Sequence, residues 1–173
     1  MARVYFSIGS NQEPRKHIDL ALRELGRRFG HLDVSPVYRN QAIGFDGADF
    51  LNLVVGLNTS KSVHDIRLEI EAIHELAKRS RQGGKLVSRT LDIDLLLYAQ
   101  LVTAGPPLKL PRVDVLKYAF ALRPLADIAP DECHPETGLT FAEHWKAMDQ
   151  DEHPLTLVQV GFTSRDSDPR QPR

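Results

Sequence analysis

The feature that most constrains this chain is an alternating run near its centre, residues 91–98. Leucine and isoleucine alternate with polar residues over most of the run, which is typical of a strand with one buried and one accessible face. Successive side chains of a strand point to opposite faces, so Asp92 and Asp94 share a face, with Cα atoms roughly 6.5–7 Å apart. The chain must therefore form a sheet in which this face is not sealed under a helix.

Two carboxylates at this spacing repel each other and seldom stabilise a fold. A pair of divalent cations that bridge phosphate oxygens would explain Asp92 and Asp94, because Mg²⁺ binds carboxylate and phosphate oxygens. The simpler alternative is a solvated strand face on which aspartate is tolerated. The two aspartates alone leave both interpretations open.

The segment just before the aspartates is strongly basic and is interrupted by Gly83 and Gly84. It contains five cations within twelve residues, namely Lys78, Arg79, Arg81, Lys85 and Arg89. Arginine presents a planar fork to phosphate oxygens, and paired glycines suit a flap that closes over a polyphosphate. Cations at a helix C-terminus would account for only the first two. Together with the carboxylates, this segment predicts phosphoryl transfer without a P-loop, since no Walker-type glycine loop is present.

Apolar periodicity and turn residues divide the chain into strands and helices. We expect strands over 4–8, 32–38, 50–57 and 91–98, helices over 14–29 and 62–79, and helical pieces over 115–119, 121–128 and 140–148. This order predicts an α+β fold with a ferredoxin-like βαββαβ core. Its sheet would be mixed or antiparallel, with helices on one face and extra C-terminal helices, and the other face would be available for a site.

Length and composition fit one globular domain. The chain has 173 residues, of which 42% are hydrophobic and 26% charged, and its net charge of −1 gives no overall attraction to nucleic acid or membrane. No apolar run approaches the ~20 residues that span a bilayer, and the first residues lack a signal-peptide layout. We therefore expect a cytoplasmic protein with a single domain over 1–160 and a disordered tail over 161–173.

Several motifs in the same order make the chain resemble the 6-hydroxymethyl-7,8-dihydropterin pyrophosphokinases of folate biosynthesis. The resemblance covers about residues 4–129 and includes Gly9-Ser10-Asn11, Tyr38-Arg39, Asp49-Phe50-Leu51-Asn52, Arg89-Thr90-Leu91-Asp92-Ile93-Asp94 and Pro124-Leu125-Ala126-Asp127-Ile128-Ala129-Pro130. Members of that family have a ferredoxin-like fold. They transfer the β,γ-pyrophosphate of ATP to a pterin hydroxymethyl group with two Mg²⁺ ions and release AMP, so the resemblance implies small-molecule partners and this activity.

The resemblance also implies roles for individual residues. The catalytic residues would be Arg79, Arg89, Asp92 and Asp94, and the two aspartates would bind both metal ions. ATP would contact Arg79, Arg81, Lys85, Arg89 and Arg112. The pterin would contact Asn40, Gln41, Ala42, Ile43, Phe50, Asn52 and Phe120. Asn52 would bond to the pterin edge, since an amide both donates and accepts, and Phe120 would stack on the ring; the simpler alternatives are a turn residue and ordinary core.

The chain departs from the family pattern around the expected pocket. Asn40-Gln41-Ala42 replaces a proline-containing segment, His74 an acidic residue, Leu86 an aromatic one, Arg112 a histidine and Tyr118 a basic residue. Two alternatives follow: an enzyme that acts on another heterocyclic alcohol, and a non-catalytic protein that binds nucleotide or pterin. A ferredoxin-like nucleic-acid binder is disfavoured, because that class needs exposed aromatics on central strands and a basic face. Oligomeric state does not follow from the sequence.

Overall fold

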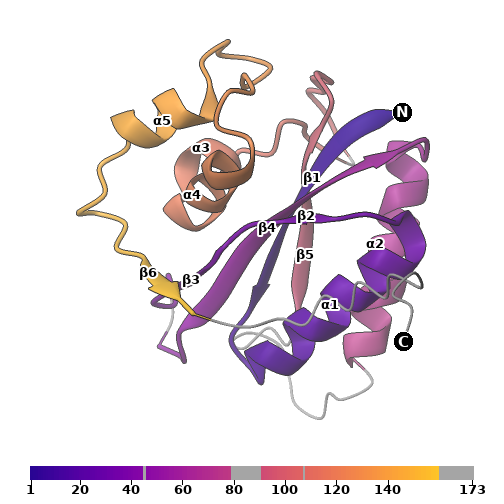
Figure 1. Cartoon of the computed structure of the whole chain (residues 1–173), viewed down its shortest axis with the longest axis horizontal. Coiled ribbons are helices and arrows are strands. Elements are labelled where there is room, and N and C mark those ends of the chain that lie inside the picture. The colour runs from indigo at the N-terminus through magenta and orange to yellow at the C-terminus, as the bar shows by residue number, and fades with distance from the viewer. Residues whose placement is uncertain (45, 79–90, 107, 160–173) are drawn as a thin grey trace, which may run out of the picture.

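The computed structural model describes residues 1–44, 46–78, 91–106 and 108–159. Its centre is an antiparallel sheet in the order β5-β1-β4-β3-β6, with β2 also paired to β4 (Figure 1). The strands are β1 (Ala2–Ser10), β2 (Asp33–Val34), β3 (Val37–Asn40), β4 (Phe50–Thr59), β5 (Asp92–Tyr98) and β6 (Thr156–Val158). The order of elements and the antiparallel pairing confirm the predicted ferredoxin-like fold.

Two long helices, α1 (Pro14–Phe29) and α2 (Val63–Lys78), cover one face of the sheet (Figure 1). Proline suits the first turn of α1, and Gly30 ends it at a φ of 89°, which favours glycine. The hydroxyl of Ser62 accepts a hydrogen bond from the backbone N–H of Asp65 at 3.1 Å and caps α2. Both helices bury their apolar sides against alternate residues of β1, β4 and β5, which form the larger core.

Three shorter helices lie on the opposite face: α3 (Asp114–Lys117), α4 (Ala119–Ile128) and α5 (Phe141–Ala147). They bury a second core that includes Tyr5, Val54 and Leu96 from the sheet. These three strand residues point away from α1 and α2, so they need an apolar cover of their own. The face of the sheet opposite α1 and α2 is therefore accessible only where α3, α4 and α5 do not cover it.

The structure differs from the expected elements at two places. The strand expected over 32–38 is divided into β2 and β3 by Ser35 and Pro36, because proline cannot donate to a strand ladder. Ser35 compensates, since its backbone N–H donates to the carbonyl of Val54 and its Oγ accepts from the N–H of Val54, at 2.9 and 2.8 Å. Strand β6 was not expected, and the tail expected over 161–173 lies outside the described residues.

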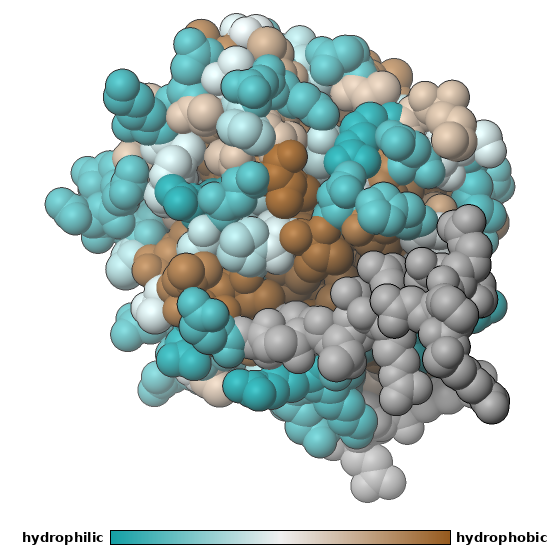
Figure 2. Space-filling view, in the orientation of Figure 1, coloured by the Kyte–Doolittle hydropathy of each residue, from teal (hydrophilic) through white to brown (hydrophobic). Residues whose placement is uncertain are grey.

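A helix that spans a membrane must be both long and apolar. No helix in the part of the chain that the structure describes is long enough and apolar enough to cross a bilayer. In the view of Figure 2, polar side chains cover most of the face and apolar ones gather near its middle, over the strands.

Candidate active site

One row of paired residues crosses the sheet on the face opposite α1 and α2. Asp92 of β5 pairs with Gly9 of β1, and Gly9 pairs with Asn52 of β4. Directly paired residues of antiparallel strands point to the same face, so this carboxylate and this amide share one surface. They are two strand spacings apart, roughly 10 Å. In the next row Asp94 pairs with Ser7.

The two aspartates lie on β5, at the edge of the sheet. Ile93 and Leu95, which alternate with them, are buried in the core beneath α1 and α2. The carboxylates therefore point to the other face, as the alternation predicts. The side chain of Asp94 is 25% exposed and Asp92 is also half-buried, so neither is sealed under a helix.

Arg112 lies directly beside this carboxylate pair. Its backbone N–H donates to the carbonyl of Leu96 at 2.9 Å, which ties the segment before α3 to β5. Its guanidinium lies 3.5 Å from Asp94 and donates to Asp114 at 2.9 Å. Burial alone would lower the pKa of Arg112, but the hydrogen bond to Asp114 and the charges of Asp94, Asp114 and Asp92 raise it above the usual value. Arg112 thus stays a cation next to the aspartates.

His74 of α2 supports the same strand from its outer edge. The backbone N–H of Ile93, which lies between the two aspartates, donates to Nε2 of His74 at 3.0 Å. An accepting Nε2 requires the neutral ring with its proton on Nδ1, and Nδ1 lies 3.6 Å from Glu71. A histidine at the position where the resemblance leads one to expect an acidic residue therefore still supplies an acceptor.

Five of the seven residues expected to contact a pterin line one hollow of about 180 Å³. Its lining residues are Asn40, Gln41, Ala42, Ile43, Ala119, Phe120, Glu152, His153, Pro154 and Leu155. The other two expected residues, Phe50 and Asn52, are not among its lining residues but are joined to Asn40, which is one of them. The amide of Asn52 donates to Oδ1 of Asn40, and Phe50 pairs with Asn40 between β4 and β3. The ring of Phe120 stacks on Tyr118, with centroids 4.9 Å apart.

Gly9 is required by the close approach of Asn52. A Cβ atom on Gly9 would lie 2.6 Å from Oδ1 of Asn52, which is too close for any ordinary contact. Asn52 is only 7% exposed, so its amide has little room to withdraw. The sequence pointed to the Gly9-Ser10-Asn11 motif without a role, and the structure supplies one: a residue without a side chain between Asp92 and Asn52.

A buried polar group joins the two elements that carry the walls of this hollow. The hydroxyl of Tyr38 on β3 donates to Asp127 of α4 at 2.5 Å and accepts from Arg123 at 3.1 Å. Arg123 and Asp127 are also 3.3 Å apart. Burial raises the pKa of Tyr38, and the hydrogen bond to Asp127 raises it further. The Tyr38 and Asp127 motifs thus hold together the elements that bear Asn40 and Phe120.

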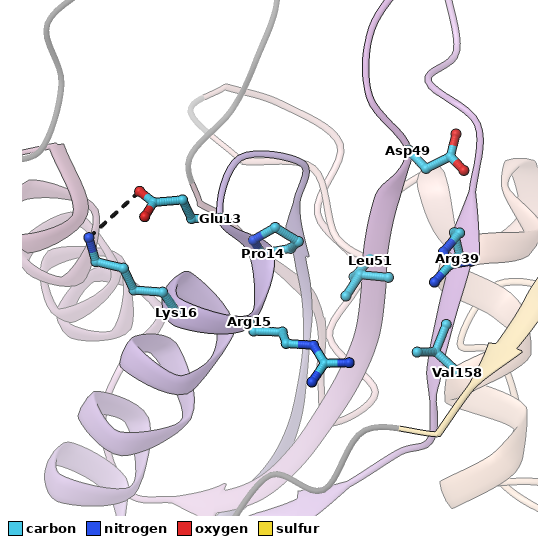
Figure 3. A pocket seen from close by; sticks show the side chains of 8 residues that line it. All are labelled: Glu13, Pro14, Arg15, Lys16, Arg39, Asp49, Leu51 and Val158. Atoms are coloured by element: carbon cyan, nitrogen blue, oxygen red, sulfur yellow. Dashed lines mark ion pairs between the residues drawn. The ribbon is translucent and has the colours of Figure 1, made fainter.

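A larger hollow, of about 450 Å³, lies on the other face and contains none of the expected site residues (Figure 3). The residues that line it are Glu13, Pro14, Arg15, Lys16, Arg39, Asp49, Leu51 and Val158. Figure 3 shows them at the start of α1 and on or just before β3, β4 and β6, with Glu13 directed toward Lys16, to which it is paired at 3.6 Å. Arg39 and Leu51 alternate with Asn40 and Asn52, so this hollow is separated from the candidate site by the sheet.

Four of the five residues expected to contact ATP are not among those that the structure describes. These four are Arg79, Arg81, Lys85 and Arg89. Within the described ranges, no group of three or more histidine, cysteine, aspartate or glutamate side chains could hold a metal ion.

Comparison with known proteins assigns the chain to a family. A sequence model of the family described as 7,8-dihydro-6-hydroxymethylpterin-pyrophosphokinase (HPPK) matches residues 5–130. This chain belongs to the HPPK family. It is therefore an enzyme of the ATP-dependent pyrophosphokinase class. The matched region ends before α5 and β6.

Relatives of this HPPK chain are named as pyrophosphokinases. It is 38% identical over 133 residues to the 2-amino-4-hydroxy-6-hydroxymethyldihydropteridine pyrophosphokinase of Pseudomonas aeruginosa, covering 75% of this chain and 82% of the relative. It is 34% identical over 137 residues to the enzyme of the same name from Aquifex aeolicus, covering 78% and 85%. A solved structure of Plasmodium falciparum HPPK-DHPS with pteroate matches with a TM-score of 0.68 at 13% identity and covers 84% of this chain. The match spans 42% of that longer chain and supports the fold.

Proposed function

We propose that this HPPK protein transfers pyrophosphate from ATP to the hydroxymethyl group of 6-hydroxymethyl-7,8-dihydropterin and releases AMP. The observation that carries the proposal is the row of Asp92, Gly9 and Asn52 across three strands. It puts the carboxylate of Asp92 and the amide of Asn52 on one face, roughly 10 Å apart, and Asn52 is bonded to Asn40 at the hollow. That separation suits a flat acceptor held at Asn52 with its alcohol directed toward phosphates at the carboxylates.

The residues of β5 fit a site for the two magnesium ions that would accompany ATP. Asp92 and Asp94 offer hard oxygen ligands on one accessible face, and Mg²⁺ is commonly held by one or two carboxylates together with substrate phosphates and water. When bound, such ions neutralise phosphate charge and make the acceptor hydroxyl more acidic. The hydrogen bond from Ile93 to His74 would hold the carboxylate-bearing strand in place.

Arginines would supply the other side of the phosphate site. Arg112 is fixed beside Asp94 by its bond to Asp114, and its planar guanidinium would contact phosphate oxygens. We include Arg79, Arg81, Lys85 and Arg89 in the same role on the basis of the sequence pattern, with Arg79 and Arg89 closest to the transferring group. Their charges would stabilise the negative charge of the transferring and leaving oxygens.

The acceptor side would orient the alcohol rather than activate it. Asn52, held by Asn40, would bond to the polar edge of the pterin, and Phe120 would contact its face. Holding the two reactants in this geometry lowers the entropic part of the activation barrier, because binding has already brought them together and oriented them.

The direct test is product analysis. Purified protein is incubated with ATP, Mg²⁺ and 6-hydroxymethyl-7,8-dihydropterin, and AMP and ADP are separated and quantified. The proposal predicts AMP that forms only when the acceptor is present. Formation of ADP in place of AMP would refute it, because the γ-phosphate alone would then be transferred. No acceptor-dependent product at all would also refute it and would favour a non-catalytic binding protein.

A second candidate is pyrophosphate transfer to a different heterocyclic alcohol. The observation that favours it is the composition of the hollow, where Asn40, Gln41 and Ala42 replace the usual proline-containing segment. Comparing kcat/KM for the dihydropterin with values for other pterin alcohols would separate the two candidates, because the true acceptor must have the highest value.

A further inference from the structure

Five of the expected pterin-binding residues line the smaller hollow described above. Part of its wall comes from a C-terminal segment that lies beyond the sequence motifs and beyond the match to the family. Residues Glu152, His153, Pro154 and Leu155 line the hollow, together with Asn40–Ile43, Ala119 and Phe120. The match to the HPPK family ends at residue 130, and the sequence alone gave this segment no role.

The wall segment is anchored on both sides. Before it, α5 is fixed by Phe141, which is 1% exposed, and by a capping box in which Thr140 and Glu143 bond reciprocally. After it, β6 pairs with β3, so that Leu157 lies opposite Tyr38. Since β3 also leads into Asn40, the two walls of the hollow are connected through one pair of strands. The elements on both sides therefore hold the segment in place as a wall of the hollow.

His153 is the residue of this wall with the capacity to recognise a ligand. Its side chain is half-buried at the hollow, and among the residues that the structure describes its ring makes no hydrogen bond. An imidazole donates from one ring nitrogen and accepts at the other, which matches the mixed donor and acceptor edge of a pterin. Leu155, also half-buried, adds apolar wall, whereas the carboxylate of Glu152 is exposed at the rim.

We propose that the segment 152–155 completes the acceptor site and that His153 is a specificity-determining residue that binds the heterocycle of the acceptor. The inference rests on the proposed function, since it names a further contact for the same substrate. His153 would act in binding the acceptor and not in the phosphate chemistry, because Asp92, Asp94 and Arg112 lie on β5 and beside it rather than at the hollow.

The experiment compares the full-length wild-type chain with His153→Ala, His153→Asn and the matched control His64→Ala. His64 is an exposed residue of α2, on the other face of the sheet. Binding of 6-hydroxymethyl-7,8-dihydropterin is followed by its fluorescence in the presence of Mg²⁺ and a non-hydrolysable ATP analogue. The KM values for acceptor and for ATP are measured separately, and circular dichroism verifies the fold of each variant.

The loss of one or two hydrogen bonds to the acceptor should weaken its binding about 5- to 10-fold in His153→Ala. His153→Asn, which keeps a donor and an acceptor, should recover part of this loss. The KM for ATP should stay within about twofold of wild type, and His64→Ala should change neither constant.

Unchanged acceptor binding in folded His153→Ala would overturn this inference while the wild-type activity still supported the proposed function. Equal losses for acceptor and ATP would also overturn it, since they would indicate a general structural effect. Wild-type protein that neither binds nor converts the dihydropterin would overturn the proposed function, and this inference with it.

Discussion

At the scale of single residues, Gly9 offers the sharpest test of the site geometry. In Gly9→Ala the new Cβ would approach Oδ1 of Asn52 to 2.6 Å, so the amide must rotate and lose its bond to Asn40. We expect the KM for the acceptor to rise about tenfold or more, which corresponds to the loss of one good hydrogen bond. The KM for ATP should change less. Steady-state kinetics with each substrate varied in turn would measure both. Equal KM values in variant and wild type would show that Asn52 does not contact the acceptor.

His74 makes a second prediction, at the level of one hydrogen bond. His74→Leu leaves the N–H of Ile93 without its acceptor, which should destabilise the protein by about 1–3 kcal/mol and weaken Mg²⁺-dependent nucleotide binding. His74→Gln can still present an oxygen to that N–H and should lie close to wild type in both properties. Urea unfolding and the Mg²⁺ dependence of nucleotide binding would measure the two effects. If glutamine proves as damaging as leucine, the hydrogen bond is not what matters at this position.

At the scale of elements, an ion-pair group joins α1 to α2. Glu69 accepts hydrogen bonds from Lys61 and from Arg28, and these bonds, strongest from Lys61, lower the pKa of Glu69 below its usual 4.5 despite the opposing effect of burial. A lowered folded-state pKa gives stability that is present above about pH 4.5 and is lost as the pH falls through the folded-state value.

Glu69→Gln should therefore lower the free energy of unfolding by about 1 kcal/mol near pH 7, and by much less near pH 3. Urea denaturation of wild type and variant at both pH values would measure the difference. Glu75→Gln is the matched control, because its ion pair with Lys78 on α2 is largely exposed and should contribute little at either pH. A Glu69→Gln effect that does not change with pH would contradict the role of the charge.

The elements that could be predicted are those with a strong local signal. α1 has its predicted bounds, and those of α2 differ from the predicted 62–79 by one residue at each end, since proline, serine and apolar spacing act within each helix. The second predicted strand is divided at Pro36, because proline lacks the N–H that a strand ladder requires. β6 could not be predicted, because three residues show no periodicity and the strand depends on β3, more than a hundred residues earlier.

At the scale of the whole molecule, the chain builds one face from segments that are distant in sequence. Strand alternation predicted that Asp92 and Asp94 share a surface, but only the register across β5, β1 and β4 aligns Asp92 with Asn52. The place of His153 at the hollow could not have been found from the sequence, because it depends on the path from α5 to β6. Local sequence patterns identify the chemical groups. The register of the sheet and the path of the chain from α5 to β6 determine which of these groups lie close together.

The central claim is that the carboxylate pair of β5 holds the metal–nucleotide complex from which pyrophosphate is transferred. The most direct test is acceptor-dependent AMP release by Asp94→Asn, which keeps the size of the side chain and removes its charge, measured beside wild type over a range of Mg²⁺ concentrations. The account predicts that the variant loses AMP release by at least about a thousandfold while acceptor binding persists, because the charge that holds the metal is gone. AMP release near the wild-type rate would contradict it.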